Sequence, residues 1–281
     1  MIKDFSKYKY YDEIQKLRLI DDIFMTQFFK DCIPCTEFVL NIILNRNDLK
    51  VKNVKTQKLI KGLGKERALS LDIFAEDETG KGYNIEIQRA DEGADKRRAR
   101  FHSSIIDSIS LKSGNKFSEL CDNYVIFITE NDVLKGGLPL YTINRYIEEN
   151  GKIFDDGSHI IYVNGSDRNS STALGKLMHD FFEPDPSKMF YSVLAERTKY
   201  FKETDKEIKK MDDFTIRMRN AGREEGREEG RKEGRKEERE NIVKTMLQKG
   251  KLALDEISEY TGISLRRVKA IAKSSGIIIP K

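Results

Sequence analysis

Three polar side chains lie close together in the sequence, within two short apolar segments. Asp72 follows Leu69-Ser-Leu71, and Glu86 and Gln88 end the segment that begins at Tyr83. Carboxylate oxygens are the ligands that Mg²⁺ prefers, and a bound divalent ion polarises phosphoryl oxygens and activates water. These residue types therefore predict metal-dependent hydrolysis of a phosphodiester bond.

The turn between the two segments decides whether their acids meet. Residues 77–81, Asp-Glu-Thr-Gly-Lys, are typical of a hairpin turn. A hairpin centred on Thr79 places Asp72 opposite Glu86, with both carboxylates on one face, and strand alternation adds Gln88 to that face. Two facing acids repel each other unless a cation or a basic group balances them. The alternative is an exposed polar sheet face with loosely spaced acids.

Several elements must hold this hairpin in place. β-rich or alternating patterns predict a three-stranded meander, and a short, almost continuous apolar run predicts a strand buried on both faces. Two further strands follow with weaker patterns. The predicted strands are Val51–Ile60, Ala68–Glu76, Tyr83–Gln88, Tyr124–Thr129, Leu138–Tyr146 and His159–Val163.

Helical spacing of apolar residues predicts the remaining elements of this region. One helix begins near Asp21, where acids favour the positive end of a helix dipole, and another is amphipathic with a basic start. The other predicted helices are Glu37–Leu49, 93–112, Ser171–Phe182 and Met189–Tyr200. Together with the strands they predict a mixed α/β domain over residues 1–205.

Length and composition set the class of protein. A chain of 281 residues holds one sizeable core plus appendages. No apolar run approaches about 18 residues, and Met1–Tyr11 alternates charged and aromatic residues instead of forming a signal peptide. We therefore expect a cytoplasmic protein without a membrane partner.

Three cysteines, Cys32, Cys35 and Cys121, cannot all pair, and a reducing compartment keeps them as thiols. Cys32 and Cys35 have the C-x-x-C spacing of redox and zinc sites. A tetrahedral zinc shell needs a second pair, which the sequence lacks. A structural role is the favoured interpretation.

Residues 206–240 predict a charged helical linker. Gly-Arg-Glu-Glu-like units repeat every four residues from Gly222, and residues 222–239 carry seven basic and seven acidic side chains. Charge pairs one helical turn apart stabilise a helix by about 0.2–0.5 kcal/mol each, whereas each glycine costs about 0.8–1.0 kcal/mol. A solvated, marginal helix is favoured over a stripe of glycines that packs against another helix.

Residues 241–281 predict a small helix-turn-helix-like tail. Eight basic residues against three acidic ones give it a net charge of +5. A short helix over Asn241–Gly250 precedes two more around Gly262, which supplies the turn. The last helix carries Arg266, Arg267 and Lys269, as expected of a helix near the DNA backbone. A plain interaction module is the alternative.

Taken together, these motifs resemble the PD-(D/E)XK nuclease superfamily, and more closely the Rpn family of recombination-promoting nucleases and transposases. The resemblance implies a restriction-endonuclease-like α/β core, a mixed sheet flanked by helices, with a C-terminal helical extension. It is carried by Asp72 and its hairpin, Ile85-Glu-Ile-Gln88, Arg98-Ala-Arg-Phe-His102, Tyr124–Thr129, the glycine repeats and the terminal helix pair.

The resemblance also implies roles for individual residues. Asp72 and Glu86 would be the ligands of Mg²⁺, and Gln88 would stand where the superfamily usually has its lysine. Asp22 would be an extra metal ligand, with Asp21 an equally placed competitor. The family typically has Arg and Tyr at the positions of Arg98 and His102, and these two side chains would contact DNA phosphate or brace the site.

The function expected from these features is that of a Mg²⁺-dependent DNA endonuclease that promotes recombination. Two alternatives remain open. One is a catalytically inactive DNA-binding or recombination accessory protein. The other is an oligomerising interaction protein, suggested by the glycine repeats and the helical tail.

Overall fold

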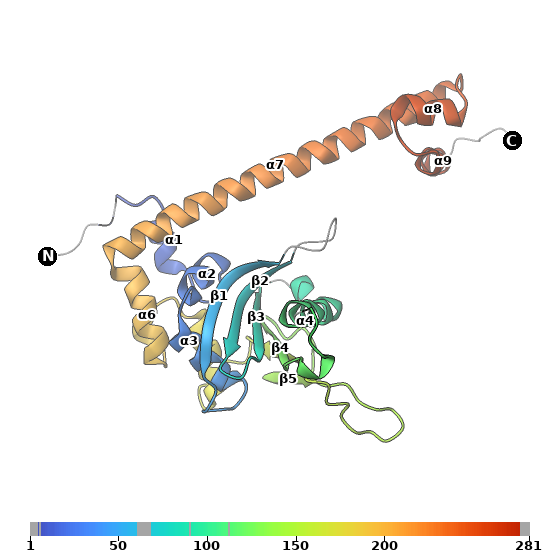
Figure 1. The fold of residues 1–281 in the computed structure, drawn as a ribbon. Helices are drawn as coiled ribbons and strands as arrows, with labels where there is room; N and C mark the ends of the chain where they lie inside the picture. The colour runs from blue at the N-terminus through green and yellow to red at the C-terminus, as the bar shows by residue number, and fades with distance from the viewer. Residues whose placement is uncertain (1–4, 6, 61–68, 90, 112, 276–281) are drawn as a thin grey trace. The chain divides into compact units, whose positions relative to one another are not determined.

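A computed structural model describes residues 5, 7–60, 69–89, 91–111 and 113–275. The chain divides into two compact units, Met1–Thr215 and Ile216–Lys281 (Figure 1). Each unit has an apolar core of its own. None of the helices in the described ranges is long and apolar enough to cross a membrane.

A six-stranded mixed sheet forms the centre of the first unit, with strand order β1-β2-β3-β4-β6-β5. Its strands are β1 (Val51–Ile60), β2 (Leu69–Asp77), β3 (Gly82–Gln88), β4 (Asn123–Thr129), β5 (Leu140–Ile143) and β6 (Ser158–Asn164). The first three pair antiparallel, so the predicted meander is confirmed. β4 lies parallel to both β3 and β6, and β5 closes the edge antiparallel to β6.

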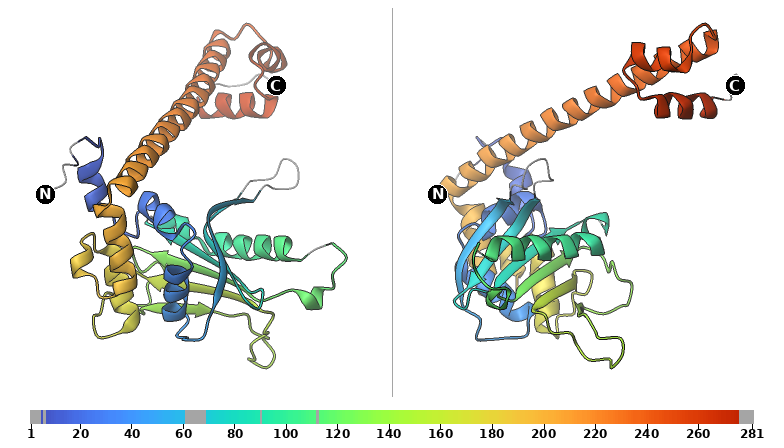
Figure 2. Two further views of the ribbon diagram at one scale, coloured as in Figure 1. Left: turned by 60° about the vertical axis from the view of Figure 1, so that its left-hand side comes forward. Right: turned by 45° about the vertical axis from the view of Figure 1, so that its right-hand side comes forward.

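Helices cover both faces of this sheet (Figure 2). α4 (Lys96–Ser110) lies on one face, where Ala99 and Ile106 pack against Phe74 and Phe127. The other face is covered by α2 (Asp22–Phe29), α3 (Ile33–Ile43), α5 (Ala173–Phe182) and α6 (Ser192–Glu203), with α1 (Tyr11–Lys16) and the start of α7 (Asp205–Lys249) beside them. Short 3₁₀ turns occupy Asp91–Ala94, Phe117–Glu119 and Pro186–Lys188. The predicted mixed sheet flanked by helices is confirmed.

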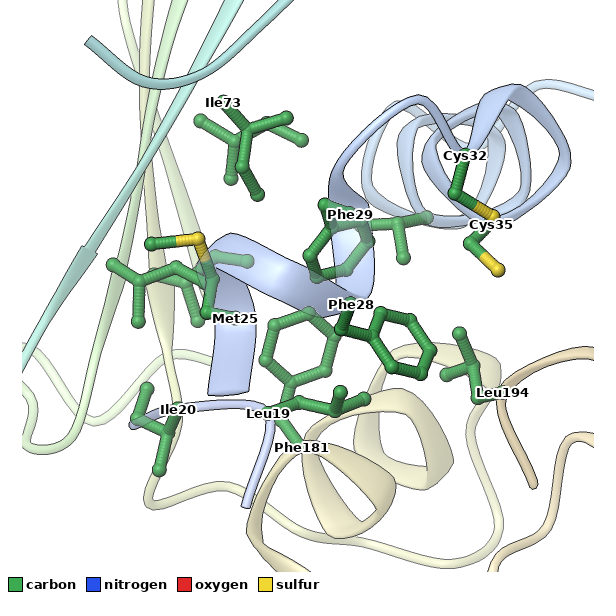
Figure 3. Packing of buried hydrophobic residues seen from close by; sticks show 14 of the residues in the cluster. Leu19, Ile20, Met25, Phe28, Phe29, Cys32, Cys35, Ile73, Phe181 and Leu194 are labelled. Atoms are coloured by element: carbon green, nitrogen blue, oxygen red, sulfur yellow. The ribbon is translucent and has the colours of Figure 1, made fainter. Parts of the chain in front are cut away.

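The larger core fixes the position of α2 (Figure 3). Phe28 and Phe29 of this helix have ring centroids 5.0 Å apart, and the Phe29 ring lies 6.2 Å from that of Phe181 in α5. Both α2 rings are fully buried, which stabilises the fold by roughly 1.5–3 kcal/mol per side chain. The N-terminus of α2, with Asp22 in its first turn, is thereby held against the sheet.

The predicted helix Glu37–Leu49 is wrong at both ends. α3 begins at Ile33. Pro34 is tolerated in its first turn, because the backbone N–H that proline lacks would have no hydrogen-bond partner within the helix there. It ends at Ile43, and Asn45 then takes a left-handed conformation with φ 50°. Cys32 and Cys35 are buried thiols at the start of this helix, among core residues (Figure 3).

The second unit consists of the rest of α7 with α8 (Leu254–Thr261) and α9 (Leu265–Ser274). Its core joins the last turns of α7 to both short helices, through Val243, Leu247, Ile257, Val268, Ile271 and Ala272. Gly262 has φ 66° and forms the predicted turn. The prediction of a separate helix over 241–250 is wrong, since α7 runs without a break from the predicted linker to Lys249.

The four repeat glycines, Gly222, Gly226, Gly230 and Gly234, have open space where a Cβ would lie, with no described atom within 4 Å. Within the described part of this chain, no other element therefore packs against the glycine stripe. Contacts at these four positions therefore do not offset the cost of the glycines to the helix.

Candidate active site

The β2–β3 hairpin has the register that the sequence predicts. The Asp77 carboxylate accepts hydrogen bonds from the amides of Thr79 (2.8 Å) and Lys81 (3.0 Å), which closes the turn. Ile73 pairs with Ile85, as a hairpin centred on Thr79 requires. Continuing this register by one residue brings Asp72 to the level of Glu86.

Beyond the Ile73 and Ile85 pair, side chains replace the backbone ladder between the two strands. The Asp72 amide donates to Oε1 of Glu86 (3.2 Å), and the Ile87 amide donates to Oδ2 of Asp72 (3.1 Å). Each carboxylate thus accepts a hydrogen bond from a backbone amide of the opposite strand. The tertiary structure brings together the two acids that the sequence singled out.

Glu86 has no exposed surface and a dense set of donors. Its Oε1 accepts from Asn84 Nδ2 (3.0 Å) as well as from the Asp72 amide, and its Oε2 accepts from Arg98 Nη2 (2.9 Å). A buried charge is tolerated only when it is paired and hydrogen-bonded. Arg98 therefore supplies the counter-charge for Glu86.

Asp72 is less completely satisfied. Burial and the neighbouring charge of Glu86 raise its pKa to about 7, while the hydrogen bond from the Ile87 amide works in the opposite direction. In the described part of the chain, only one of its two carboxylate oxygens accepts a hydrogen bond. A proton on Asp72 near neutral pH marks a position where added positive charge is favourable.

Asp21 and Asp22 occupy different environments at the start of α2. Asp21 is the N-cap residue and is engaged by Arg18 (3.1 Å) and by Arg89 (3.2 Å). Burial raises the pKa of Asp22, and the charges of Asp21 and Glu86 add to the effect while Arg89 opposes it. Of these two acids, Asp22 is therefore the one without an ion pair among the described residues. Its pKa is also the one that the charge of Glu86 raises.

The three acids do not form a ready-made metal centre. Among the residues that the structure describes, no group of three or more His, Cys, Asp or Glu side chains is arranged to hold a metal ion. Asp72 and Glu86 are in mutual contact, whereas Asp22 is linked to them only through the electrostatic effect on its pKa.

Gln88 contacts Arg98 beside Gly93, a glycine that the sequence did not single out. Arg98 Nη1 donates to Oε1 of Gln88 (3.4 Å) and to the carbonyl of Gly93 (3.0 Å). A Cβ at Gly93 would lie 1.9 Å from that same Oε1. Gly93 thus leaves the space in which the Gln88 amide meets Arg98. In the sequence, only its position between β3 and α4 could have indicated this role.

The first turn of α4 aims Arg98 at this cluster. Asp95 caps the helix by accepting from the amides of Arg97 (2.7 Å) and Arg98 (3.3 Å). Residues four apart share one helix face, so His102 lies beside Arg98, and Arg98 Nε donates to His102 Nε2 (3.3 Å). His102 is fully buried and has no exposed surface for a DNA phosphate.

Asn84 completes the polar face of β3 and was not singled out from the sequence. It alternates with Glu86 and Gln88 along the strand, so the same period-two argument would have found it. Its Nδ2 lies 3.1 Å from His102 Nδ1, and its Oδ1 is buried with no hydrogen-bond partner among the described residues. An unpaired buried acceptor costs about 1–3 kcal/mol, which a bound water or cation would relieve.

The predicted DNA-contacting residues of the tail lie in the second unit. Arg266, Arg267 and Lys269 are all exposed on α9. Arg267 forms a two-pronged ion pair with Glu240 of α7, with its Nη2 2.8 Å and 2.9 Å from the two carboxylate oxygens. Of these three basic residues, Arg267 is thus already neutralised by an ion pair with Glu240.

A comparison with family models gives one match: residues 36–244 fit the model described as PD-(D/E)XK nuclease family transposase. No curated protein and no solved structure matches the chain. The matched range contains the whole sheet, with Asp72, Glu86, Gln88 and the Arg98 helix. Asp22 and the basic residues of α9 lie outside it.

Proposed function

The chain belongs to the PD-(D/E)XK nuclease family transposases, and on that premise we propose that it is a divalent-metal-dependent endonuclease that hydrolyses phosphodiester bonds of DNA. The observation that carries the proposal is the contact of Asp72 and Glu86 in the opening between β2 and β3, where each acid binds the other strand's backbone.

The donor set fits a magnesium ion. Carboxylate oxygens suit this hard cation, and Asp72 has one oxygen that accepts no hydrogen bond within the described chain. The repulsion that helps raise the pKa of Asp72, and the unpaired Oδ1 of Asn84 nearby, would both be relieved by a cation. We propose Asp72 and Glu86 as metal ligands and Asp22 as a third. When bound, the ion supplies Lewis acidity toward the phosphate and an activated water.

We propose that Arg98 supplies the positive charge that the lysine usually provides in this superfamily. Gln88 stands where the superfamily usually carries a cation, and the guanidinium of Arg98 lies within hydrogen-bonding distance of both Gln88 and Glu86. With 36% of its side chain exposed, Arg98 remains accessible to a phosphate group. It balances Glu86 and offers donors to the developing negative charge.

His102 acts on Arg98 and is a positioning residue. Arginine can only donate, so His102 Nε2 accepts the hydrogen bond from Arg98, while Nδ1 faces Asn84 Nδ2 at 3.1 Å. His102 Nδ1 lies 3.4 Å from Oε1 of Glu86. The ring thus orients Arg98 and adds a contact to Glu86 without meeting the substrate.

The test is cleavage of supercoiled plasmid by purified protein, with Mg²⁺ or Mn²⁺ and with a chelator. We expect Asp72→Asn and Glu86→Gln to reduce cleavage to background, because each keeps the side-chain shape but removes the charge that holds the metal. Asp48→Asn is the matched control, since this acid is 68% exposed on the surface of the same unit. Cleavage by Asp72→Asn at the rate of the unchanged protein would sink the proposal.

A second candidate is a family member that binds DNA, and assists recombination, without cutting it. The observation that favours this candidate is the full satisfaction of Glu86 by Arg98 and Asn84, together with the lack of a ready three-ligand centre in the described residues. DNA binding with no cleavage in Mg²⁺, Mn²⁺ or Ca²⁺ would select it.

A further inference from the structure

The charge pattern of α7 changes within the glycine repeat. The units that start at Gly222 and Gly226 read Gly-Arg-Glu-Glu, whereas those at Gly230 and Gly234 read Gly-Arg-Lys-Glu. Residues 222–230 carry two basic and four acidic side chains, and residues 231–239 carry five basic and three acidic ones. The repeat is neutral as a whole but turns from acidic to basic along the helix.

The basic half of the repeat lines a groove in the second unit. Lys232, Arg235, Lys236 and Arg239 are spaced by three, one and three residues, which places them on one face of α7. The start of α9 forms the opposite wall. We call these four residues the α7 basic face. Acids of the same stretch, Glu237 and Glu238, line a different surface hollow.

The one acid in the groove is already neutralised. Glu240 binds Arg267 through both of its carboxylate oxygens. Within the described residues, none of the four side chains of the α7 basic face takes part in an ion pair. The groove therefore presents four cations to solvent with no counter-charge.

We propose that this groove binds the phosphodiester backbone of duplex DNA. Four cations along eight helical residues span about 10 Å, and a duplex carries one negative charge per about 1.7 Å of its axis. Contacts of this kind hold DNA without reading its sequence. The inference rests on the proposed function for the identity of the polyanion, and it places the main contact on α7 and not on the exposed residues of α9.

The side chains that line the groove favour DNA over a membrane as the occupant. An interfacial membrane helix needs a wide apolar face beside its basic one. The groove lining is dominated by charged side chains, with Ile263 as its one large apolar residue. An acidic protein remains an outcome of the test, and it would leave the chain without affinity for DNA.

The test measures binding of a fluorescent 20-base-pair duplex by the full chain, without metal, over a series of salt concentrations. Lys232→Gln/Lys236→Gln removes two charges from the groove. Arg223→Gln/Arg227→Gln removes two from the same helix outside it and is the matched control. The groove variant should weaken binding about tenfold at 200 mM salt and lower the slope of log affinity against log salt by about 2. The control should change affinity less than twofold.

Glu240→Gln tests the opposite direction, because it releases Arg267 into the groove and should tighten binding and steepen the salt dependence. Equal losses in the groove variant and its control, no loss in either, or no binding by the unchanged chain would overturn the inference. Because no metal is present, a chain that never cuts DNA can still satisfy this test. A chain that cuts DNA while the groove variant binds normally keeps the proposed function and loses this inference.

Discussion

Two arginine–glutamate pairs in this protein have the same chemistry and different degrees of burial. Arg98 of α4 meets Glu86 of β3, and the arginine is 36% exposed whereas the glutamate side chain has no exposed surface. Arg267 meets Glu240 in the second unit, where the arginine is 52% exposed and the glutamate 18%. Surface ion pairs contribute about 0–1 kcal/mol, whereas removing one partner of a buried pair costs about 3–5 kcal/mol. Burial, and not residue type, sets what each pair does.

The largest effect should come from Arg98→Ala, because it leaves the Glu86 charge buried without its partner. We expect the free energy of unfolding to fall by about 3 kcal/mol and DNA cleavage to fall by about a hundredfold. Urea denaturation and plasmid cleavage measure the two effects. Arg100→Ala on the same helix is the control, since Arg100 is exposed. Equal stability of the two variants would contradict the view that burial separates the two ion pairs.

The second effect concerns Asp72 and pH. Its pKa is raised to about 7, above that of a free carboxyl, so the protonated form favours the folded state. Without metal, this contribution to stability is present at low pH and is lost as pH rises through about 7. Mg²⁺ competes with that proton, and its apparent affinity should rise by up to about tenfold per pH unit below 7.

Thermal denaturation at pH 6, 7 and 8, with and without Mg²⁺, measures this linkage. The stabilisation by Mg²⁺ should grow with pH in the unchanged protein and be absent in Asp72→Asn. A stabilisation by Mg²⁺ that does not vary with pH would exclude Asp72 as a ligand that titrates in this range.

A smaller effect is expected from Gly93→Ala. The new Cβ would overlap Oε1 of Gln88, which is the end of a flexible side chain and can turn away. Stability should therefore change by less than about 1 kcal/mol, while cleavage falls because Gln88 no longer meets Arg98. Gly114→Ala, where no described atom lies near, is the control for the added methyl group, and its positive φ makes it the more strained of the two. Full activity of Gly93→Ala would remove Gln88 from the site.

The smallest effect should follow Arg267→Ala, which opens the surface pair. The free energy of unfolding should change by no more than about 1 kcal/mol, and the change should shrink further in 1 M salt. Denaturation at two salt concentrations measures it. A loss as large as that of Arg98→Ala would mean that burial does not explain the difference between the pairs.

Local rules were enough to predict the hairpin. Period-two alternation and the turn centred on Thr79 placed Asp72 at the level of Glu86, and the pairing of Ile73 with Ile85 has that register. The apolar run that becomes β4 was equally clear, because a short strand buried on both faces needs no polar positions. Helix limits were less predictable, as α3 shows.

The continuity of α7 could not be predicted from propensity, because glycine and charge-pair terms nearly cancel over the repeat. Packing of Val243 and Leu247 against α8 and α9 stabilises the last turns of α7, and the helix extends through the repeat to reach them. The prediction of a separate helix over 241–250 was wrong for this reason.

By itself, the sequence determined which acids share a strand face and how the hairpin aligns them, since both follow from backbone geometry within one short segment. Only the tertiary structure decided which cation each acid meets. It places Asp21 in ion pairs with Arg18 and Arg89, and Glu86 in an ion pair with Arg98. The pKa of Asp72 was also decided there, because burial and charge proximity depend on contacts between elements far apart in the chain.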